Sequence, residues 1–306
     1  MSSHESWPES LKRITGTVGL WTSTTDTTPA RDVAAVAERI ESMGYGALWI
    51  PEAWGREAFT HASLLLAATS RLVVATGIAN IWGRDAVATQ AAAKTLNAAY
   101  EGRFILGLGV SHAPLVERLR GHEYSGPVSM MRSYLEAMDQ APSFSPEANE
   151  PYARVIAALG PKMLETARDL THGAHPYLVT PEHTAIARET LGANKFIGVE
   201  QAVVLGGTDE EYLARAAAHL EIYTGLDNYR NSWRRLGFTD EDFVRGGSER
   251  LRRAMVVHGD EDDILERVRE HQRAGANHVC LQFLSGNLTE APMADWERVA
   301  ERMRAA

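Results

Sequence analysis

The sequence has very little cysteine and no long apolar segment. Its single cysteine, Cys280, cannot form an internal disulfide, and it lies in the apolar run 279–283, so we expect a buried thiol. No run approaches the roughly 18 apolar residues of a membrane span. Residues 1–10 are polar and lack the apolar region of a signal peptide. We therefore expect a cytoplasmic protein without a membrane partner.

Positive charge is also in short supply. The 306 residues include 31 Lys and Arg against 40 Asp and Glu, which gives a formal net charge of −9. A general nucleic-acid binder needs a basic face for the phosphates, so this balance argues against a nucleic-acid partner. It does not exclude an anionic cofactor, because a few local donors are enough to hold one phosphate group.

Several widespread catalytic and metal-binding motifs are missing as well. The sequence has no Gly-x-Ser-x-Gly nucleophile elbow, no phosphate-binding P-loop and no His-Glu-x-x-His zinc motif. His172, His175 and His183 lie close together in the chain, but no cysteine or carboxylate set accompanies them at ligand spacing. We therefore predict no metal site.

Short apolar runs alternate with amphipathic stretches along almost the whole chain. The runs are apolar throughout, as in a parallel sheet that is buried on both faces, and the stretches have helical spacing. The predicted strands are 17–21, 47–50, 72–78, 104–110, 154–159, 174–179, 196–205 and 278–284. About eight such β-then-α units predict an α/β fold, the (β/α)8 TIM barrel, which takes roughly 250 residues.

Three segments fall outside this alternation. They are a polar N-terminal tail, 1–13, and two inserts, 111–126 after the fourth strand and 225–254 in the region of strands seven and eight. No linker or internal repeat divides the chain, so we expect one barrel domain over 14–306 that carries both inserts.

Local signals also predict where helices begin. Proline in the first helical turn is expected at Thr28-Pro29, Gly126-Pro127, Gly160-Pro161 and Thr180-Pro181. Thr208 and Glu211 have the spacing of a capping box. These signals concern structure and carry no chemistry of their own.

The residues that follow each strand are the candidates for a site, because TIM-barrel enzymes build their active sites at the strand ends. Glu52 and His112 lie at such positions, and each could transfer protons or be an ordinary loop residue. Large aromatic residues also follow strand ends, where they either line a pocket for a flat ring system or plug the barrel: Trp21, Trp54, Trp82 and Tyr177.

Glycines mark two further places. Gly107 and Gly109 share one face of a strand, where they either leave room for a ligand or allow close packing. Gly160-Pro161-Lys162 opens a helix directly after a strand, so its free N–H groups and the lysine suit a phosphate. An ordinary helix start with a solvated lysine has the same sequence.

Taken in order, these segments resemble the luciferase-like family of flavin- and deazaflavin-dependent oxidoreductases. The similarity is greatest to the branch that uses coenzyme F420, an 8-hydroxy-5-deazaflavin, and it runs from about Gly16 to Phe283. It rests on the turn 49–54, on Thr76-Gly77-Ile78-Ala79-Asn80, and on the segments 102–109, 157–161 and 172–177.

The resemblance implies a homodimer, a bound F420 (with FMN as the alternative cofactor) and a cis peptide bond at Gly77–Ile78 behind the cofactor ring. It assigns phosphate contacts to Leu159 and Gly160, which agrees with the helix start before Lys162. It assigns ring contacts to Glu52, Thr76, Gly77, Ile78, Asn80, Gly109 and Val110.

The chain departs from its relatives at three positions. Some relatives have Asp-His after the second strand, where this chain has Glu52-Ala53, and a carboxylate after the fourth, where it has His112. His112 is therefore our main candidate for proton transfer, because histidine titrates near neutral pH. Thr180 replaces the lysine with which some relatives bind a sugar phosphate, so we do not expect a sugar phosphate as substrate.

We therefore expect an enzyme, an oxidoreductase that transfers hydride between F420 and a small organic substrate. The substrate would carry an activated C=C, C=N or C=O group, or would be an alcohol. Its pocket would be shaped by Trp21, Trp54, Trp82 and Tyr177, with His112 and Glu52 as the catalytic residues. The alternatives are an FMN-dependent monooxygenase of the same fold and a non-catalytic barrel that binds the cofactor.

Overall fold

Eight parallel strands close into a barrel in the computed structural model, which describes residues 7–146, 148, 151–287 and 289–305. In barrel order they are β1 (Val18–Trp21), β2 (Ala47–Ile50), β3 (Val73–Thr76), β5 (Phe104–Gly109), β6 (Ala153–Ile156), β7 (Gly173–Ala174), β8 (Phe196–Leu205) and β10 (His278–Phe283). β10 pairs with both β8 and β1, which closes the ring and confirms the predicted TIM barrel. Two short strands extend it: β4 (Ala79–Asn80) pairs with β5, and β9 (Val256–Gly259) pairs with the end of β8.

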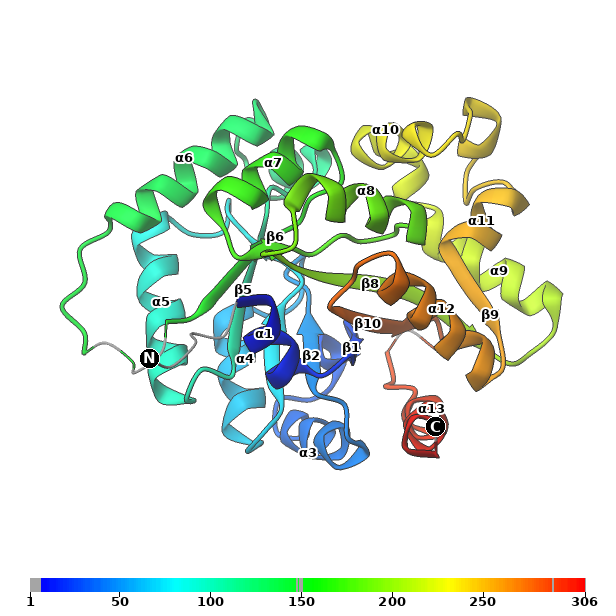
Figure 1. Ribbon diagram of the computed structural model, residues 1–306, viewed down its shortest axis with the longest axis horizontal. Coiled ribbons are helices and arrows are strands. Elements are labelled where there is room, and N and C mark those ends of the chain that lie inside the picture. The colour runs from blue at the N-terminus through cyan, green and yellow to red at the C-terminus, as the bar shows by residue number, and fades with distance from the viewer. Residues whose placement is uncertain (1–6, 147, 149–150, 288, 306) are drawn as a thin grey trace.

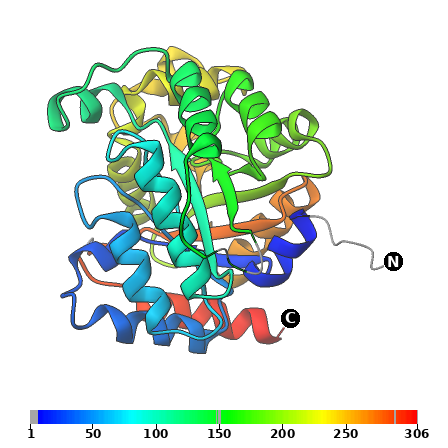
Figure 2. The same ribbon diagram turned by 90° about the vertical axis from the view of Figure 1, so that its left-hand side faces the viewer.

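Helices surround this barrel, as Figures 1 and 2 show. The helices that follow the strands are α3 (Val33–Met43), α4 (Ala58–Ala67), α5 (Ala86–Ala99), α6 (Pro127–Gln140), α7 (Pro161–Leu170), α8 (Pro181–Leu191), α9 (Asp209–Leu220), α12 (Glu261–Arg273) and α13 (Met293–Ala305). The last helix, α13, packs beside α3. There the hydroxyl of Tyr45 donates a hydrogen bond to the carbonyl oxygen of Trp296 over 2.9 Å. The two ends of the chain thus help to close the outer layer.

Most of the predicted helix starts are confirmed. Pro127, Pro161 and Pro181 lie in the first turns of α6, α7 and α8, and Thr208 forms the predicted capping box of α9. The prediction at Thr28 is wrong. Thr28 ends the short helix α2 (Thr24–Thr27), where its hydroxyl donates to the carbonyl oxygen of Thr24.

The N-terminal segment 1–13 differs from the polar tail that we expected. From Trp7 onward it forms helix α1 (Trp7–Thr15), which packs at the N-terminal end of the barrel. Leu11 is only 2% exposed and belongs to the same apolar cluster as Trp49 and Phe196 inside the barrel. The helix is amphipathic, with Glu9, Lys12 and Arg13 on its exposed face.

The two inserts differ in structure. Segment 111–126 is irregular on both sides of one short π-helical turn, η1 (Leu115–Leu119). Segment 225–254 is largely helical, with α10 (Asp227–Arg235), the 3₁₀ turn η3 (Asp240–Phe243) and most of α11 (Glu249–Met255), and it follows the 3₁₀ turn η2 (Tyr223–Gly225). Trp233 of α10 is fully buried, and its Nε1–H donates to the carbonyl oxygen of Leu178 after β7. The second insert is therefore anchored at the carboxyl end of the barrel.

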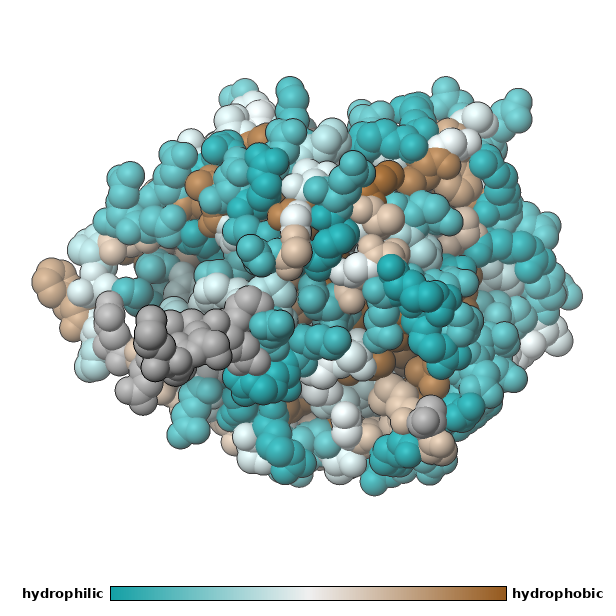
Figure 3. Space-filling view, viewed as in Figure 1, coloured by the Kyte–Doolittle hydropathy of each residue, from teal (hydrophilic) through white to brown (hydrophobic). Residues whose placement is uncertain are grey.

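The outer surface is mainly polar. Figure 3 shows a largely hydrophilic face on which hydrophobic residues form scattered patches. Among the described residues, no helix has both the length and the apolar character that crossing a membrane requires.

Candidate active site

Trp21 and Gly77 meet at the carboxyl end of the barrel. Trp21 ends β1, and its Nε1–H donates to the carbonyl oxygen of Gly77 over 2.9 Å. The Gly77–Ile78 peptide bond is cis, as the resemblance implies. A Cβ atom on Gly77 would lie 2.9 Å from both Trp21 Nε1 and His175 Nε2, so glycine is needed for this close approach.

Gly107 and Gly109 allow close packing of β5 against the chain after β3. A Cβ on Gly107 would lie 2.0 Å from the carbonyl oxygen of Thr76, and one on Gly109 would lie 2.4 Å from Cγ1 of Ile78. Thr76 is fully buried, and its hydroxyl donates to the Gly107 carbonyl and accepts from the Gly107 N–H. The structure thus favours the packing alternative for both glycines, and the side chain of Ile78 covers Gly109.

Glu52 joins the loops after β2 and β3. Its carboxylate forms a two-pronged ion pair with Arg84, and it accepts hydrogen bonds from the N–H groups of Asn80 (2.8 Å) and Ala58 (3.3 Å). The Glu52 side chain is 6% exposed and that of Arg84 is 13% exposed. Because both carboxylate oxygens already accept hydrogen bonds, this geometry favours a positioning role for Glu52 over proton transfer.

His112 lies after β5, where the two inserts meet. Its ring centroid is 5.7 Å from that of Tyr229 in α10, and its side chain is hydrogen-bonded to Asn228. The Nδ1 atom is buried without a hydrogen-bond partner. Burial lowers the pKa of His112 to about 4, although the bond to Asn228 raises it slightly, so the imidazole is neutral at pH 7.

An aromatic cluster forms around Tyr177, which follows β7. Its ring centroid lies 5.4 Å from that of Trp21, 5.5 Å from Tyr223 and 6.4 Å from Tyr229. The Tyr177 hydroxyl donates to Oε1 of Gln282 over 2.8 Å and accepts a hydrogen bond from the Tyr223 hydroxyl. Tyr223 and Tyr229 come from η2 and α10, so this part of the chain covers the end of the barrel.

The other two predicted substrate residues lie elsewhere. Trp82 packs under the first insert, where its Nε1–H donates to the carbonyl oxygen of Val110 and its ring contacts His122 and Tyr124. Trp54 is 68% exposed on the loop after β2. The structure therefore brings Trp21 and Tyr177 together, but it does not place Trp54 or Trp82 in this cluster.

Two residues beside Tyr177 were not predicted as site residues. His175 stacks on Trp49 with ring centroids 4.2 Å apart, its Nδ1 is 2.8 Å from the Gly198 carbonyl oxygen, and its Nε2 has no partner. Glu200 of β8 is fully buried; its Oε2 accepts from the Leu178 N–H over 2.9 Å, and its Oε1 has no partner. A glutamate inside a ten-residue buried strand is the sequence signal that could have identified the second residue.

The predicted phosphate contacts lie at the start of α7, joined by a cation from the second insert. Gly160 caps the helix, and Lys162 is exposed in its first turn. The guanidinium of Arg235, at the end of α10, donates to the carbonyl oxygen of Leu159 over 3.2 Å, and it lies 3.6 Å from the position of a Cβ on Gly160. Sequence reasoning missed Arg235 because 75 residues separate it from Gly160.

Comparison with known proteins decides the family. A sequence model of the luciferase-like monooxygenases matches residues 14–278. The chain belongs to this family. It is therefore an enzyme, and its fold is the one that the family resemblance implied.

Individual relatives and structures of similar fold include F420-dependent enzymes and monooxygenases. A Mycobacterium tuberculosis protein named as a coenzyme F420-dependent oxidoreductase is 31% identical over 112 residues, 37% of this chain and 32% of that protein. The 5,10-methylenetetrahydromethanopterin reductase of Archaeoglobus fulgidus is 23% identical over 78% of this chain and 85% of its own. Two solved structures share the fold. An F420-dependent secondary alcohol dehydrogenase matches with a TM-score of 0.71 and 14% identity, over 93% of this chain and 97% of its own. The EDTA monooxygenase of Chelativorans matches with a TM-score of 0.72 and 10% identity, over 94% of this chain and 93% of its own.

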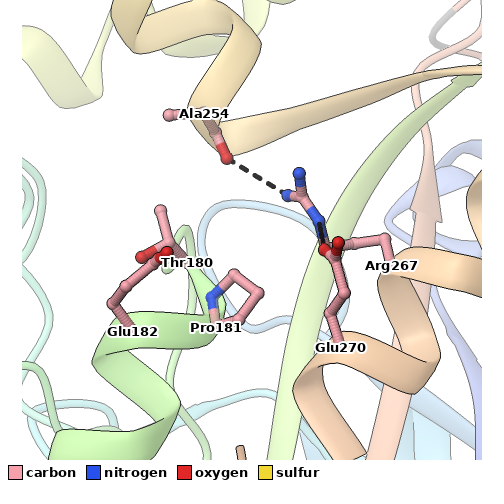
Figure 4. Close-up of a pocket in the computed structure, with 6 residues that line it drawn as sticks. All are labelled: Thr180, Pro181, Glu182, Ala254, Arg267 and Glu270. Atoms are coloured by element: carbon pink, nitrogen blue, oxygen red, sulfur yellow. Dashed lines mark hydrogen bonds and ion pairs between the residues drawn. The ribbon is translucent and has the colours of Figure 1, made fainter. Parts of the chain in front are cut away.

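A surface pocket of this luciferase-like chain is separate from the candidate site. It has a volume of about 420 Å³ and is lined by Thr180, Pro181, Glu182, Ala254, Arg267 and Glu270 (Figure 4). The Arg267 guanidinium is already bonded to Glu270 and to the Ala254 carbonyl oxygen. The pocket therefore presents two carboxylates and one cation that is already engaged.

The three histidines considered for a metal site have separate surroundings. His172 Nδ1 accepts from the Arg154 N–H, His175 lies inside the barrel, and His183 Nε2 is 3.0 Å from the Leu159 carbonyl oxygen. Within the part of the chain that the structure describes, no group of three or more His, Cys, Asp or Glu side chains is arranged to hold a metal ion.

Proposed function

We propose that this protein is an oxidoreductase that transfers hydride between coenzyme F420 and a small uncharged organic substrate. A relative and a structure of the same fold are both named as F420-dependent. The segments that resemble the F420 branch, 76–80 and 157–161, lie at the ends of β3 and β6. This location supports F420 as the cofactor.

The observation that carries the proposal is a group of buried polar atoms without partners near Tyr177. They are His175 Nε2, Glu200 Oε1 and His219 Nε2, with His112 Nδ1 beside Tyr229. Buried polar atoms in folded proteins nearly always have a hydrogen-bond partner. Their concentration in one place supports a ligand whose polar edge pairs with them.

The residues present fit a cofactor with a polar ring and an anionic tail. The Nδ1 of His175 faces a carbonyl oxygen and must carry the hydrogen, so its Nε2 is an acceptor for a ring N–H group. The start of α7, with Gly160, Lys162 and Arg235, provides N–H groups and cations for a phosphate. When bound there, F420 would supply the carbon that gives up or takes up a hydride.

The electrostatics of the barrel end support an uncharged substrate. Burial lowers the pKa of His112, His175 and His219 to about 4 and raises that of Glu200 to about 8, so all four are neutral at pH 7. A charged substrate would lose its hydration here without gaining an ion-pair partner from these groups. A neutral carbonyl compound, imine, activated alkene or alcohol would not have this penalty.

An FMN-dependent monooxygenase is the second candidate, because the structure of the EDTA monooxygenase matches the fold as well as that of the F420-dependent alcohol dehydrogenase does. The two are separated by titrating the purified protein with oxidised F420 and with FMN while following cofactor fluorescence. We expect saturable binding of F420. Tight binding of FMN without binding of F420 would contradict the proposal, and binding of neither would favour a barrel without this catalytic role.

We also propose that the enzyme acts as a homodimer, as the resemblance implies. Leu64 of α4 and Val87 of the neighbouring α5 are large apolar side chains that are 42% and 50% exposed. Light scattering should give about twice the chain mass of 33.6 kDa. A mass of one chain at micromolar concentration would contradict the dimer.

A further inference from the structure

Glu200 faces the interior of the barrel at the level of the candidate site. Residues two apart on a strand share one face, and Gly198, two residues before Glu200, has Trp49 of β2 directly in front of it. The Glu200 N–H donates to the carbonyl oxygen of Pro176, immediately before Tyr177. The carboxyl group therefore lies beside the aromatic cluster, inside the ring of strands.

The surroundings of Glu200 give its charged form almost no support. One N–H group, that of Leu178, donates to Oε2. The titratable groups around it are Tyr177, Tyr223, Tyr229 and Cys280, and burial raises the pKa of each, so they are neutral at pH 7. The Tyr177 hydroxyl donates its hydrogen bond to Gln282, and the Tyr223 hydroxyl donates to Tyr177, so neither hydroxyl proton is directed at Glu200. An isolated buried carboxylate is costly, and Glu200 is therefore held as the neutral acid, in line with a pKa raised to about 8.

We propose that Glu200 is the acid of this site and presents its unpartnered Oε1 to the molecule bound at the end of the barrel, as a proton donor. This inference rests on the proposed function. In the reduction of a ketone, the carbonyl carbon takes up a hydride from reduced deazaflavin and the C=O π bond breaks. The oxygen takes the proton of Glu200, which is left as a carboxylate and regains a proton from water. His112, a neutral base at pH 7, cannot supply that proton.

The other reading of Glu200 is a structural one, in which the side chain only holds the left-handed backbone at Leu178, whose φ is 52°. Glu200→Gln distinguishes the two, because an amide oxygen can still accept the Leu178 N–H but the side chain has no acidic proton. A structural role would survive this substitution, and a proton donor would not. Asp242→Asn is the matched control, because Asp242 is 6% exposed but ion-paired with Arg250 over 2.8 Å, so it is already ionised.

The first experiment uses infrared spectra of the full chain and needs no substrate. We expect the carbonyl stretch of one protonated carboxylic acid at pH 6.5, lost around pH 8, absent in Glu200→Gln and retained in Asp242→Asn. Saturating oxidised F420 should shift this band, because the ligand meets Oε1. Absence of the band, or a band that F420 leaves unchanged while fluorescence shows it bound, would overturn the assignment. Failure of F420 to bind the wild type would instead count against the proposed function.

The second experiment follows oxidation of reduced F420 with cyclohexanone or cyclohex-2-enone as the acceptor. We expect Glu200→Gln to bind F420 with unchanged affinity and to react about 100-fold more slowly, as is typical when a general acid is removed. The wild-type rate should fall above about pH 8. Equal rates for Glu200→Gln and the wild type would overturn the role as donor, and if neither acceptor reacts with the wild type, the infrared result alone decides.

Discussion

His112 has the protonation state of a base rather than of an acid. Burial lowers its pKa to about 4, so at pH 7 its unpartnered Nδ1 can accept a hydrogen bond from the substrate hydroxyl group and orient it, while Glu200 exchanges the proton in both directions of the reaction. We predict that His112→Ala binds F420 as the wild type does but turns over a neutral alcohol about tenfold more slowly, the value of one lost hydrogen bond. Arg118→Ala, at an exposed position of the same insert, is the control. Unchanged turnover in His112→Ala would remove the residue from the mechanism.

Arg235 gives a sharper test of the phosphate position than Lys162 does, because its guanidinium is already held at the carbonyl oxygen of Leu159. We predict that Arg235→Ala weakens F420 binding by about tenfold to a hundredfold, the value of one hydrogen bond to a charged group. The neighbouring Arg234 is bonded to Asn231 and Asp240, so Arg234→Ala is a matched control. Equal affinities of the two variants in a fluorescence titration would place the phosphate elsewhere.

The residues of the candidate site could be predicted only where they belong to a short motif that is recognisable in the sequence. The cis bond at Gly77–Ile78 and the start of α7 belong to short motifs, so the resemblance located both. Glu200 and Arg235 come from strands and inserts that meet the site only in the folded barrel. Trp54 is a residue that was predicted to line the substrate pocket but does not. It follows a strand, as predicted, but its side chain is exposed rather than part of the aromatic cluster.

At the scale of elements, the N-terminal helix is a structural part of the barrel. Leu11 of α1 is buried against residues from inside the ring of strands. We predict that Leu11→Ala lowers the free energy of unfolding by about 2–5 kcal/mol, the usual cost of a cavity at a buried leucine. Lys12→Ala, on the exposed face of the same helix, should change it by less than about 0.5 kcal/mol. Equal denaturation midpoints for the two variants would show that α1 does not stabilise the barrel.

The elements themselves could largely be predicted, because each strand is apolar throughout and each helix has one apolar stripe. The strand predicted over 196–205 is β8 as the structure has it, whereas the one predicted over 174–179 is reduced to Gly173–Ala174. The difference has a physical reason. Pro176 cannot donate to a neighbouring strand, and Leu178 has a positive φ, so the chain leaves the sheet there. The helical content of 225–254 was missed because its apolar residues pack mainly on one another and on β8, outside the regular alternation.

At the scale of the whole molecule, buried histidines should make the fold sensitive to acid. Burial lowers the pKa of His112, His172, His175, His219 and His278 to about 4, and that of His271 to about 3. Between pH 6.5 and 4 the unfolded chain binds protons that the folded chain excludes, so stability falls as the pH falls. A pKa shift of this size corresponds to roughly 3 kcal/mol of unfolding free energy for each histidine. The total free energy of unfolding of a typical domain is only about 5–15 kcal/mol.

We therefore predict that the thermal midpoint drops steeply below pH 6 and that the protein unfolds before pH 4, as calorimetry at stepped pH values would show. Glu200 contributes with the opposite sign. Its pKa is raised in the fold, so the stability it confers is complete below pH 4.5 and is lost as the pH rises towards about 8. Glu200→Gln should keep the loss of stability in acid and remove the fall in stability that Glu200 causes between about pH 7 and 8. A thermal midpoint that stays constant from pH 7 to pH 4.5 would contradict the burial of neutral histidines, and an unchanged slope in Glu200→Gln would contradict a neutral Glu200.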